Sequence, residues 1–133
     1  NLSQKELTAL LLKSTAFVLP TLAEGMPLSV IEAMKAGSIP VVNDLNGGLR
    51  ELVTNDVTGY RIPNNDPLIF AERIAAIAGD GEKRKQLSAA AVSFANTHFD
   101  PVQNTKLFED CFIKEFQHAK KKTAFKTTGS RLD

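Results

Sequence analysis

Short apolar runs alternate with stretches of helical periodicity along the first half of the chain. Two such runs lie at 16–19 and 39–43, and a short third strand is expected at 60–62 after a turn at 55–59. Runs of this length and character are typical of buried parallel strands. Between and after the runs, apolar residues recur three or four positions apart, as they do on one face of a helix. The pattern predicts an α/β fold, a partial Rossmann-like parallel sheet of about three strands with flanking helices.

Capping residues mark where the helices begin. Ser3 with Glu6 forms a capping box at the start of the first helix. Asp66-Pro67 and Asp100-Pro101 each place a capping acid before a proline at the first helical position. The helix after Asp100 is predicted to close the fold as a long C-terminal helix. Its apolar stripe is expected to face the core, with the lone cysteine packed within it; the stripe consists of Phe108, Cys111, Phe112 and Phe116.

The composition is that of an ordinary globular protein with one domain. The chain has 133 residues, of which 43% are hydrophobic and 23% are charged. No apolar run is long enough to span a membrane, and no secretory leader is visible. Because the chain begins at Asn1 rather than Met, we expect it to be a processed, trimmed or excised piece. One cysteine cannot form an internal disulfide, which favours a reducing, cytoplasmic location.

Charge is distributed unevenly along the chain. Residues 119–133 carry 5 of the 16 Lys and Arg residues and 1 of the 15 acidic residues, so residues 1–118 are slightly acidic. An acidic body gives no reason to expect nucleic acid as a partner. We therefore predict one domain at 1–118 and a basic flexible tail at 119–133. The tail is a candidate for weak contact with an anionic membrane surface, although a solvated tail is the simpler interpretation.

The stretch EGMPLSVIEAMKAGSIPVVN, residues 24–43, combines a turn, a helix and a strand. The helix N-terminus from Gly25 to Leu28 presents unpaired N–H groups and a partial positive charge, which suit a phosphate. Gly25 has no Cβ and permits close approach of a ligand. Glu24 before the helix and Glu32 within it can accept hydrogen bonds from hydroxyls, including a vicinal diol. Each acid also has a plainer explanation, because acids favour helix N-termini and acids inside helices commonly face solvent.

The pattern E-G-x-P-L-S-V-I-E-A-x-x-A-G-x-P-V-V resembles the donor-site signature of retaining glycosyltransferases with the GT-B fold, of the glycosyltransferase family 4 or group 1 type. The segments 46–51, 58–63 and 98–100 resemble that family's glycine-pair loop, its G-hydrophobic-x-hydrophobic-P segment and the entry to its closing helix. The resemblance runs from about Leu10 to Phe116. It implies that residues 1–118 are the later half of a C-terminal, nucleotide-sugar-binding domain.

The resemblance also implies a role for each residue of the signature. Glu24 is the implied catalytic residue and binds hydroxyls of the donor sugar. Backbone N–H groups from Gly25 to Leu28 hold the diphosphate or the sugar, and Glu32 binds the ribose hydroxyls. The implied substrate-binding set is Glu24, Gly25, Met26, Pro27, Leu28 and Glu32. No metal and no other cofactor is expected, because the chain has no D-x-D pair and no histidine cluster with ligand spacing.

Two functions of different classes follow. In the first, the chain is part of a retaining glycosyltransferase that uses a nucleotide-diphospho-sugar. The acceptor domain and the first half of the donor domain lie outside this sequence, so the chain alone is expected to be inactive. In the alternative, it is a non-catalytic or split nucleotide-sugar-binding module that acts only with a partner chain. Arg50 and Arg61 do not match the family's basic positions and receive no role. A sheet of few strands leaves an edge or face uncovered, so dimerisation is expected.

Overall fold

The computed structural model describes residues 2–128, and the side chains of residues 2–120. The described residues divide into two units between His98 and Phe99, and each unit is described by itself below. Among the described residues, no helix combines the length and the apolar character that crossing a bilayer requires.

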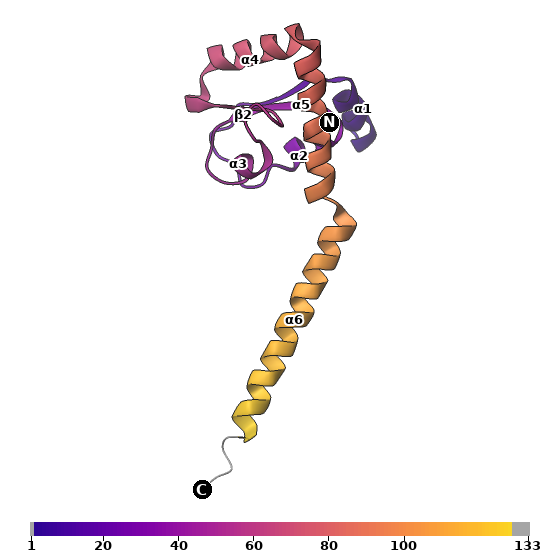
Figure 1. The fold of residues 1–133 in the computed structure, drawn as a ribbon, viewed down its shortest axis with the longest axis vertical. Coiled ribbons are helices and arrows are strands. Elements are labelled where there is room, and N and C mark those ends of the chain that lie inside the picture. The colour runs from indigo at the N-terminus through magenta and orange to yellow at the C-terminus, as the bar shows by residue number, and fades with distance from the viewer. Residues whose placement is uncertain (1, 129–133) are drawn as a thin grey trace. The chain divides into compact units, whose positions relative to one another are not determined.

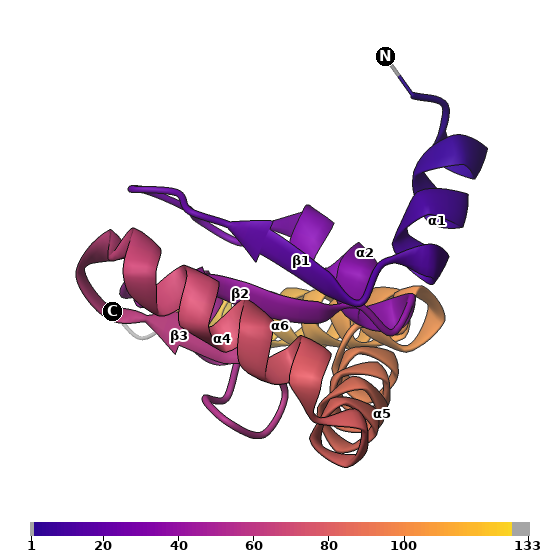
Figure 2. The ribbon, with the colours of Figure 1, turned by 90° about the horizontal axis from the view of Figure 1, so that it is seen from above.

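The first unit is built on a parallel sheet with the order β1-β2-β3 (Figure 2). The strands are β1 (Ala16–Leu19), β2 (Ile39–Asn43) and β3 (Tyr60–Ile62). β2 is central: Leu19 of β1 pairs with Val42, and Val41 pairs with Tyr60 of β3. The predicted fold class is therefore confirmed, and so are the three predicted strands and their bounds.

The strands differ in burial according to their place in the sheet. Every residue of β2 is buried, as expected for a strand with a neighbour on each side. β1 is only partly buried, and Val18 is 41% exposed. The expectation that 16–19 is a buried strand was wrong in this respect, because β1 lies at an edge of the sheet and pairs on one side only.

Six helical segments complete the first unit. In chain order they are α1 (Gln4–Lys13), α2 (Leu28–Lys35), α3 (Gly48–Leu52), the 3₁₀ turn η1 (Pro63–Asn65), α4 (Pro67–Gly79) and α5 (Gly81–His98). The predicted capping box at Ser3 and Glu6 is present, and Asp66 caps α4 ahead of Pro67. Asp80 accepts hydrogen bonds from the N–H groups of Glu82 and Lys83, so it caps the start of α5.

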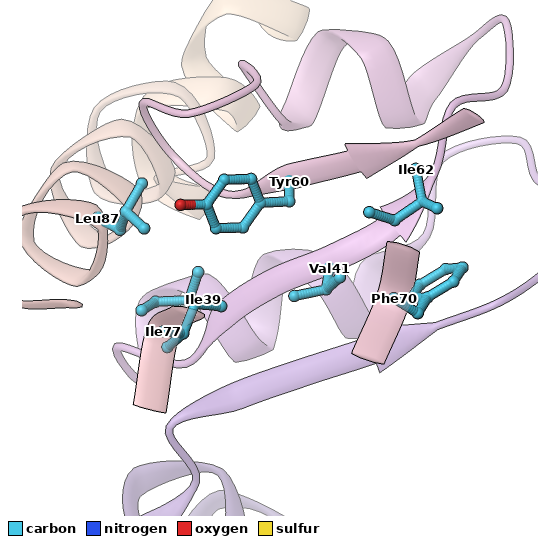
Figure 3. Close-up of a cluster of buried hydrophobic side chains, with 7 residues drawn as sticks. All are labelled: Ile39, Val41, Tyr60, Ile62, Phe70, Ile77 and Leu87. Atoms are coloured by element: carbon cyan, nitrogen blue, oxygen red, sulfur yellow. The ribbon is translucent and has the colours of Figure 1, made fainter. Parts of the chain in front are cut away.

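A compact apolar core forms where α4 and α5 meet the sheet (Figure 3). Ile39 and Val41 of β2 share one face of the strand, because side chains two positions apart point the same way. The full cluster, drawn as sticks in Figure 3, is Ile39, Val41, Tyr60, Ile62, Phe70, Ile77 and Leu87. This packing fixes β2 and β3, and with them the loops that leave their carboxyl ends.

The described part of the second unit contains the long helix α6 (Pro101–Thr128), orange to yellow in Figure 1. Phe108, Phe112, Phe116 and Cys111 are all exposed, so the predictions of a core-facing stripe and a packed thiol were wrong. A periodic apolar stripe indicates an amphipathic helix, but it does not specify what covers the apolar side.

The predicted boundary at residue 118 falls inside α6, not between two elements. The helix continues to Thr128 because the segment after 118, AKKKTAFK, consists largely of good helix formers. The first part of the predicted flexible tail is therefore helical. The remainder of that prediction, residues 129–133, lies outside the described residues.

Candidate functional site

The predicted site lies just past β1, where the chain turns into α2. Glu24 and Gly25 are exposed in this turn. Pro27 is the N-cap, with extended backbone, so α2 begins at Leu28 and not at the proline. No side chain caps the helix, and its first turn contains no acidic residue. The partial positive charge of the helix N-terminus is therefore not balanced by the helix's own side chains.

The glycine pair at 47–48 brings the loop after β2 against this turn. The Gly48 N–H donates to the Gly25 carbonyl at 3.1 Å. A Cβ on Gly48 would lie 2.1 Å from the Gly25 oxygen, so only glycine permits this approach. Gly47 has a φ of 108°, which also favours glycine. The sequence marked 46–51 by its resemblance to a glycine-pair loop; in the structure this glycine pair approaches the chain's own backbone.

Gly25 has a different environment from Gly48. A Cβ built on Gly25 would meet nothing within 4 Å. The backbone at Gly25 thus leaves open space on that side while its carbonyl is held by Gly48. Space of this kind beside an uncapped helix N-terminus is what an anionic ligand requires.

The two candidate acids have different surroundings. Glu24 is exposed, whereas Glu32 is half-buried and accepts a hydrogen bond from Gln4 Nε2 at 3.1 Å. Glu32 faces a groove of about 250 Å³ between α1 and α2. The groove is lined by Gln4, Thr8, Leu11, Leu12, Glu32, Lys35 and Ala36. Glu24 does not line this groove, so the structure places the two acids at separate parts of the candidate site.

Two of the residues that contact the candidate site were given no role from the sequence. Gln4, at the first turn of α1, is one of them, and no motif pointed to it. The other is Asn43, which is 2% exposed and donates from Nδ2 to the Thr21 carbonyl in the loop after β1. A polar residue that ends a buried apolar strand was the available signal for Asn43.

An ion cluster joins Asp44, on the loop after β2, to Arg50 of α3 and Arg61 of β3. Arg50 donates to both oxygens of Asp44, with Nε–Oδ1 at 2.8 Å and Nη2–Oδ2 at 3.2 Å. Arg61 Nη1 lies 3.5 Å from the same Oδ1. The hydrogen bond from Arg50 lowers the pKa of Asp44, and the positive charges of Arg50 and Arg61 lower it further against the effect of burial. Both arginines, to which the sequence gave no role, thus have a carboxylate partner on their own domain.

Among the described side chains, those of residues 2–120, there is no group of three or more His, Cys, Asp or Glu residues that could hold a metal ion. The polar groups that the structure places at this edge of the sheet include carboxylates, backbone N–H groups and paired arginines.

The parallel sheet and the loops at its carboxyl edge define a partial Rossmann-like domain. Residues 1–94 match the family described as glycosyl transferases group 1, and the chain belongs to that family. The match ends before α6 begins. The family predicted from the E-G-x-P-L-S-V-I-E pattern is thus confirmed.

Curated relatives in several bacteria share this region. The putative colanic acid biosynthesis glycosyltransferase WcaL of Escherichia coli K12 is 39% identical over 79 residues, covering 55% of this chain and 19% of its own length. A UDP-Gal:alpha-D-GlcNAc-diphosphoundecaprenol alpha-1,3-galactosyltransferase of Escherichia coli is 35% identical, covering 58% and 20%. A D-inositol 3-phosphate glycosyltransferase of Kribbella flavida is 40% identical, covering 57% and 18%. The chain therefore spans about a fifth of the length of these relatives.

Proposed function

We propose that this chain forms the later half of the donor site of a retaining glycosyltransferase and acts within a polypeptide of its relatives' length. In this proposal Glu24 binds hydroxyls of the donor sugar beside the reacting carbon. The N–H groups between Gly25 and Leu28 hold the diphosphate, and Glu32 accepts hydrogen bonds from the ribose hydroxyls. The donor is a nucleoside diphosphate sugar, the class to which the UDP-Gal in the name of the Escherichia coli galactosyltransferase belongs.

The observation that carries the proposal is the uncapped N-terminus of α2 beside the open side of Gly25. Backbone N–H groups at a helix N-terminus and the helix dipole together favour a phosphate. The site also lies past the carboxyl ends of parallel strands, where open α/β sheets bind their ligands. The hydrogen bond from Gly48 to the Gly25 carbonyl supports a turn that is formed before a ligand arrives.

The proposed chemistry is transfer of the sugar from the diphosphate to an acceptor hydroxyl. The bond between the anomeric carbon and the diphosphate oxygen breaks, and a bond to the acceptor oxygen forms. The acceptor proton leaves with the nucleoside diphosphate. Negative charge accumulates on the departing diphosphate, and preorganised N–H groups stabilise that charge in the transition state.

Part of this site must come from other residues of the complete protein. Arg50 and Arg61 are held by Asp44, so we assign neither of them to the diphosphate. The acceptor site and further positive charge on the diphosphate are proposed to come from the remaining four fifths that its relatives have. Accordingly, we expect no turnover by residues 1–133 alone.

The test is donor kinetics in a polypeptide of that length carrying Glu24→Gln or Glu32→Ala. Each variant should lower kcat/KM for the donor by at least about tenfold, because each removes hydrogen bonds to donor hydroxyls. Glu72→Ala is the matched control, since Glu72 is exposed on α4 and belongs to neither the loop after β1 nor the loop after β2. Donor kinetics of both site variants equal to that of the control would refute the assignment.

A second candidate is a module that binds a nucleotide-sugar without catalysis and acts with a partner chain. The exposed edge strand β1 is the observation that favours it. This candidate predicts that the complete protein binds a nucleoside diphosphate, that Glu32→Ala weakens the binding, and that no sugar is transferred or hydrolysed. Measured transfer that depends on Glu24 would exclude it.

A further inference from the structure

We propose that Asn43 is a positioning residue that fixes the loop carrying Glu24. The inference rests on the proposed function, because it assigns a second layer of support to the same donor site. Asn43 does not touch the donor in this proposal; it acts through the backbone between β1 and α2.

The position of Asn43 follows from the register of the sheet. Leu19 pairs with Val42, so Asn43 lies one residue beyond the last paired position of the two strands. From there its side-chain Nδ2 donates to the carbonyl of Thr21, two residues past the end of β1. The side chain is 2% exposed, so water does not compete strongly for this hydrogen bond.

A second hydrogen bond holds the same loop a few residues later. The Gly48 N–H donates to the Gly25 carbonyl. Asn43 is the last residue of β2 and Gly48 is the first residue of α3, so both hydrogen bonds reach this loop from residues 43–48. The loop is therefore fastened at Thr21 and at Gly25, with Glu24 between the two points. Within it, Thr21 Oγ1 donates to the Ala23 carbonyl at 3.0 Å.

The side-chain oxygen of Asn43, Oδ1, argues against a role limited to packing. Asn43 Oδ1 is buried and has no hydrogen-bond partner among the described residues. Burying an unpaired acceptor is unfavourable, and an apolar side chain of similar size would avoid that cost. What an apolar side chain would not supply is the donor to the Thr21 carbonyl. The buried amide is thus explained by its hold on the loop.

The experiment is steady-state kinetics of Asn43→Asp in a polypeptide of the relatives' length. Aspartate has nearly the same shape, but its ionised carboxylate cannot donate to the Thr21 carbonyl. We expect kcat to fall by about tenfold or more, since misplacing a reacting group by about 1 Å can cost about a hundredfold. The donor KM should change by less than about threefold, because Gly48 still holds Gly25, where the diphosphate contacts begin, and Glu32 lies within α2.

A pH profile separates positioning from general damage to the fold. A protonated carboxyl regains a donor, so kcat of Asn43→Asp relative to wild type should rise as the pH falls. The matched control is Asn96→Asp, which adds the same charge at an exposed site on α5 and should leave kcat and its pH profile unchanged. Wild-type kcat in Asn43→Asp, or a rise in KM with kcat unchanged, would overturn the inference.

Glu24→Gln in the same assay distinguishes the two possible failures. If Glu24→Gln retains full activity, the proposed site itself is wrong; if it loses activity while Asn43→Asp does not, only the positioning role is wrong. Should Asn43→Asp fail to fold, the wild-type protein supplies the test. A scalar coupling between Asn43 Nδ2 and the Thr21 carbonyl carbon, measured by NMR, is expected across the hydrogen bond, and its absence would overturn the inference.

Discussion

At the residue scale, Gly48 and Gly25 are in contact with each other but differ in the space that a Cβ would have. Gly48 is needed because its missing Cβ lets two loops touch, whereas the corresponding space beside Gly25 is open. The first glycine therefore contributes to the fold, whereas in the proposed function the second leaves room for a ligand. Substitutions can separate these two contributions.

Gly48→Ala is predicted to destabilise the protein by about 1–3 kcal/mol, as other overpacking substitutions do. The added Cβ would lie 2.1 Å from the Gly25 oxygen and 3.0 Å from Met26 Cα, so the backbone must shift. Urea unfolding measures the change in free energy. Gly79→Ala is the control, because its Cβ meets nothing within 4 Å and alanine is the better helix former. Equal stability of the two variants would contradict the prediction.

Gly25→Ala is predicted to leave the free energy of unfolding within about 0.5 kcal/mol of wild type, since its Cβ enters open space. On the proposed function, however, the same Cβ occupies space beside the diphosphate, so the affinity for a nucleoside diphosphate should fall. Calorimetric titration measures that affinity. Unchanged affinity together with unchanged stability would show that the open side of Gly25 is not used.

Asp44→Asn is predicted to cost about 0.2–1 kcal/mol at pH 7, the range of partly exposed ion pairs. The pKa of Asp44 is lowered in the folded protein, chiefly by the Arg50 hydrogen bond, so its contribution to stability is present above the ordinary pKa of 3.8 and is lost as the pH falls through the lowered value. The difference between wild type and variant should thus shrink below about pH 4. A difference that stayed constant from pH 7 to pH 2 would contradict this account.

α2 shows how one element serves both the core and the site. Its buried residues are Val30, Ile31, Ala33 and Met34, while Leu28 and Glu32 are turned at least partly toward solvent. Packing of the buried side of the helix therefore fixes the direction of the helix N-terminus. It also fixes the position of Glu32, which lies on the partly exposed side. The orientation of the candidate site is thus a consequence of core packing.

Met34→Ala should lower the free energy of unfolding by about 2–5 kcal/mol, because Met34 is fully buried and its truncation leaves a cavity. Leu28→Ala is the control on the same helix. Leu28 is 71% exposed, so its change is expected to remain within about 0.5 kcal/mol. Denaturant unfolding of both variants provides the comparison, and similar losses would mean that α2 is not anchored by its buried face.

Elements were predictable from the sequence where burial alone decides them. Two apolar runs and the short segment after the turn at 55–59 predicted the strands, and capping residues such as Ser3 and Asp66 predicted helix starts. The exposure of β1 was not predictable, because the number of neighbours of a strand depends on pairing across the sheet. The contacts of Asn43 and Gly48 were missed because they join loops about twenty residues apart. Periodicity describes one element at a time and carries no signal for such contacts.

Uncovered apolar surface is the main feature at the scale of the whole molecule. On α6 the rings of Phe108, Phe112 and Phe116 are more than 60% exposed, and on the sheet β1 has a free edge. Surfaces of this kind are usually covered by other parts of a protein or by a partner. The chain spans about a fifth of the length of its relatives. In the proposed function, residues of the longer polypeptide cover these surfaces.

Residues 1–133 in isolation are predicted to dimerise or aggregate, and light scattering measures the mass. Two variants distinguish the surfaces: Phe112→Asp should reduce association through α6, and Val18→Lys should reduce association through the edge of β1. Lys106→Asp is the control for a charge change on α6, because Lys106 lines a different part of the helix surface from Phe108 and Phe112. A monodisperse monomer of the wild-type chain would contradict the prediction.

The central claim is that the turn from Glu24 to Leu28 holds the diphosphate of a donor, and hydrogen exchange tests it most directly. A polypeptide of the relatives' length would be exchanged with and without a nucleoside diphosphate. We predict slower exchange at the amides of Gly25, Met26 and Leu28, with no change along α6. Slowing confined to other segments, or no slowing at saturating nucleotide, would contradict the account.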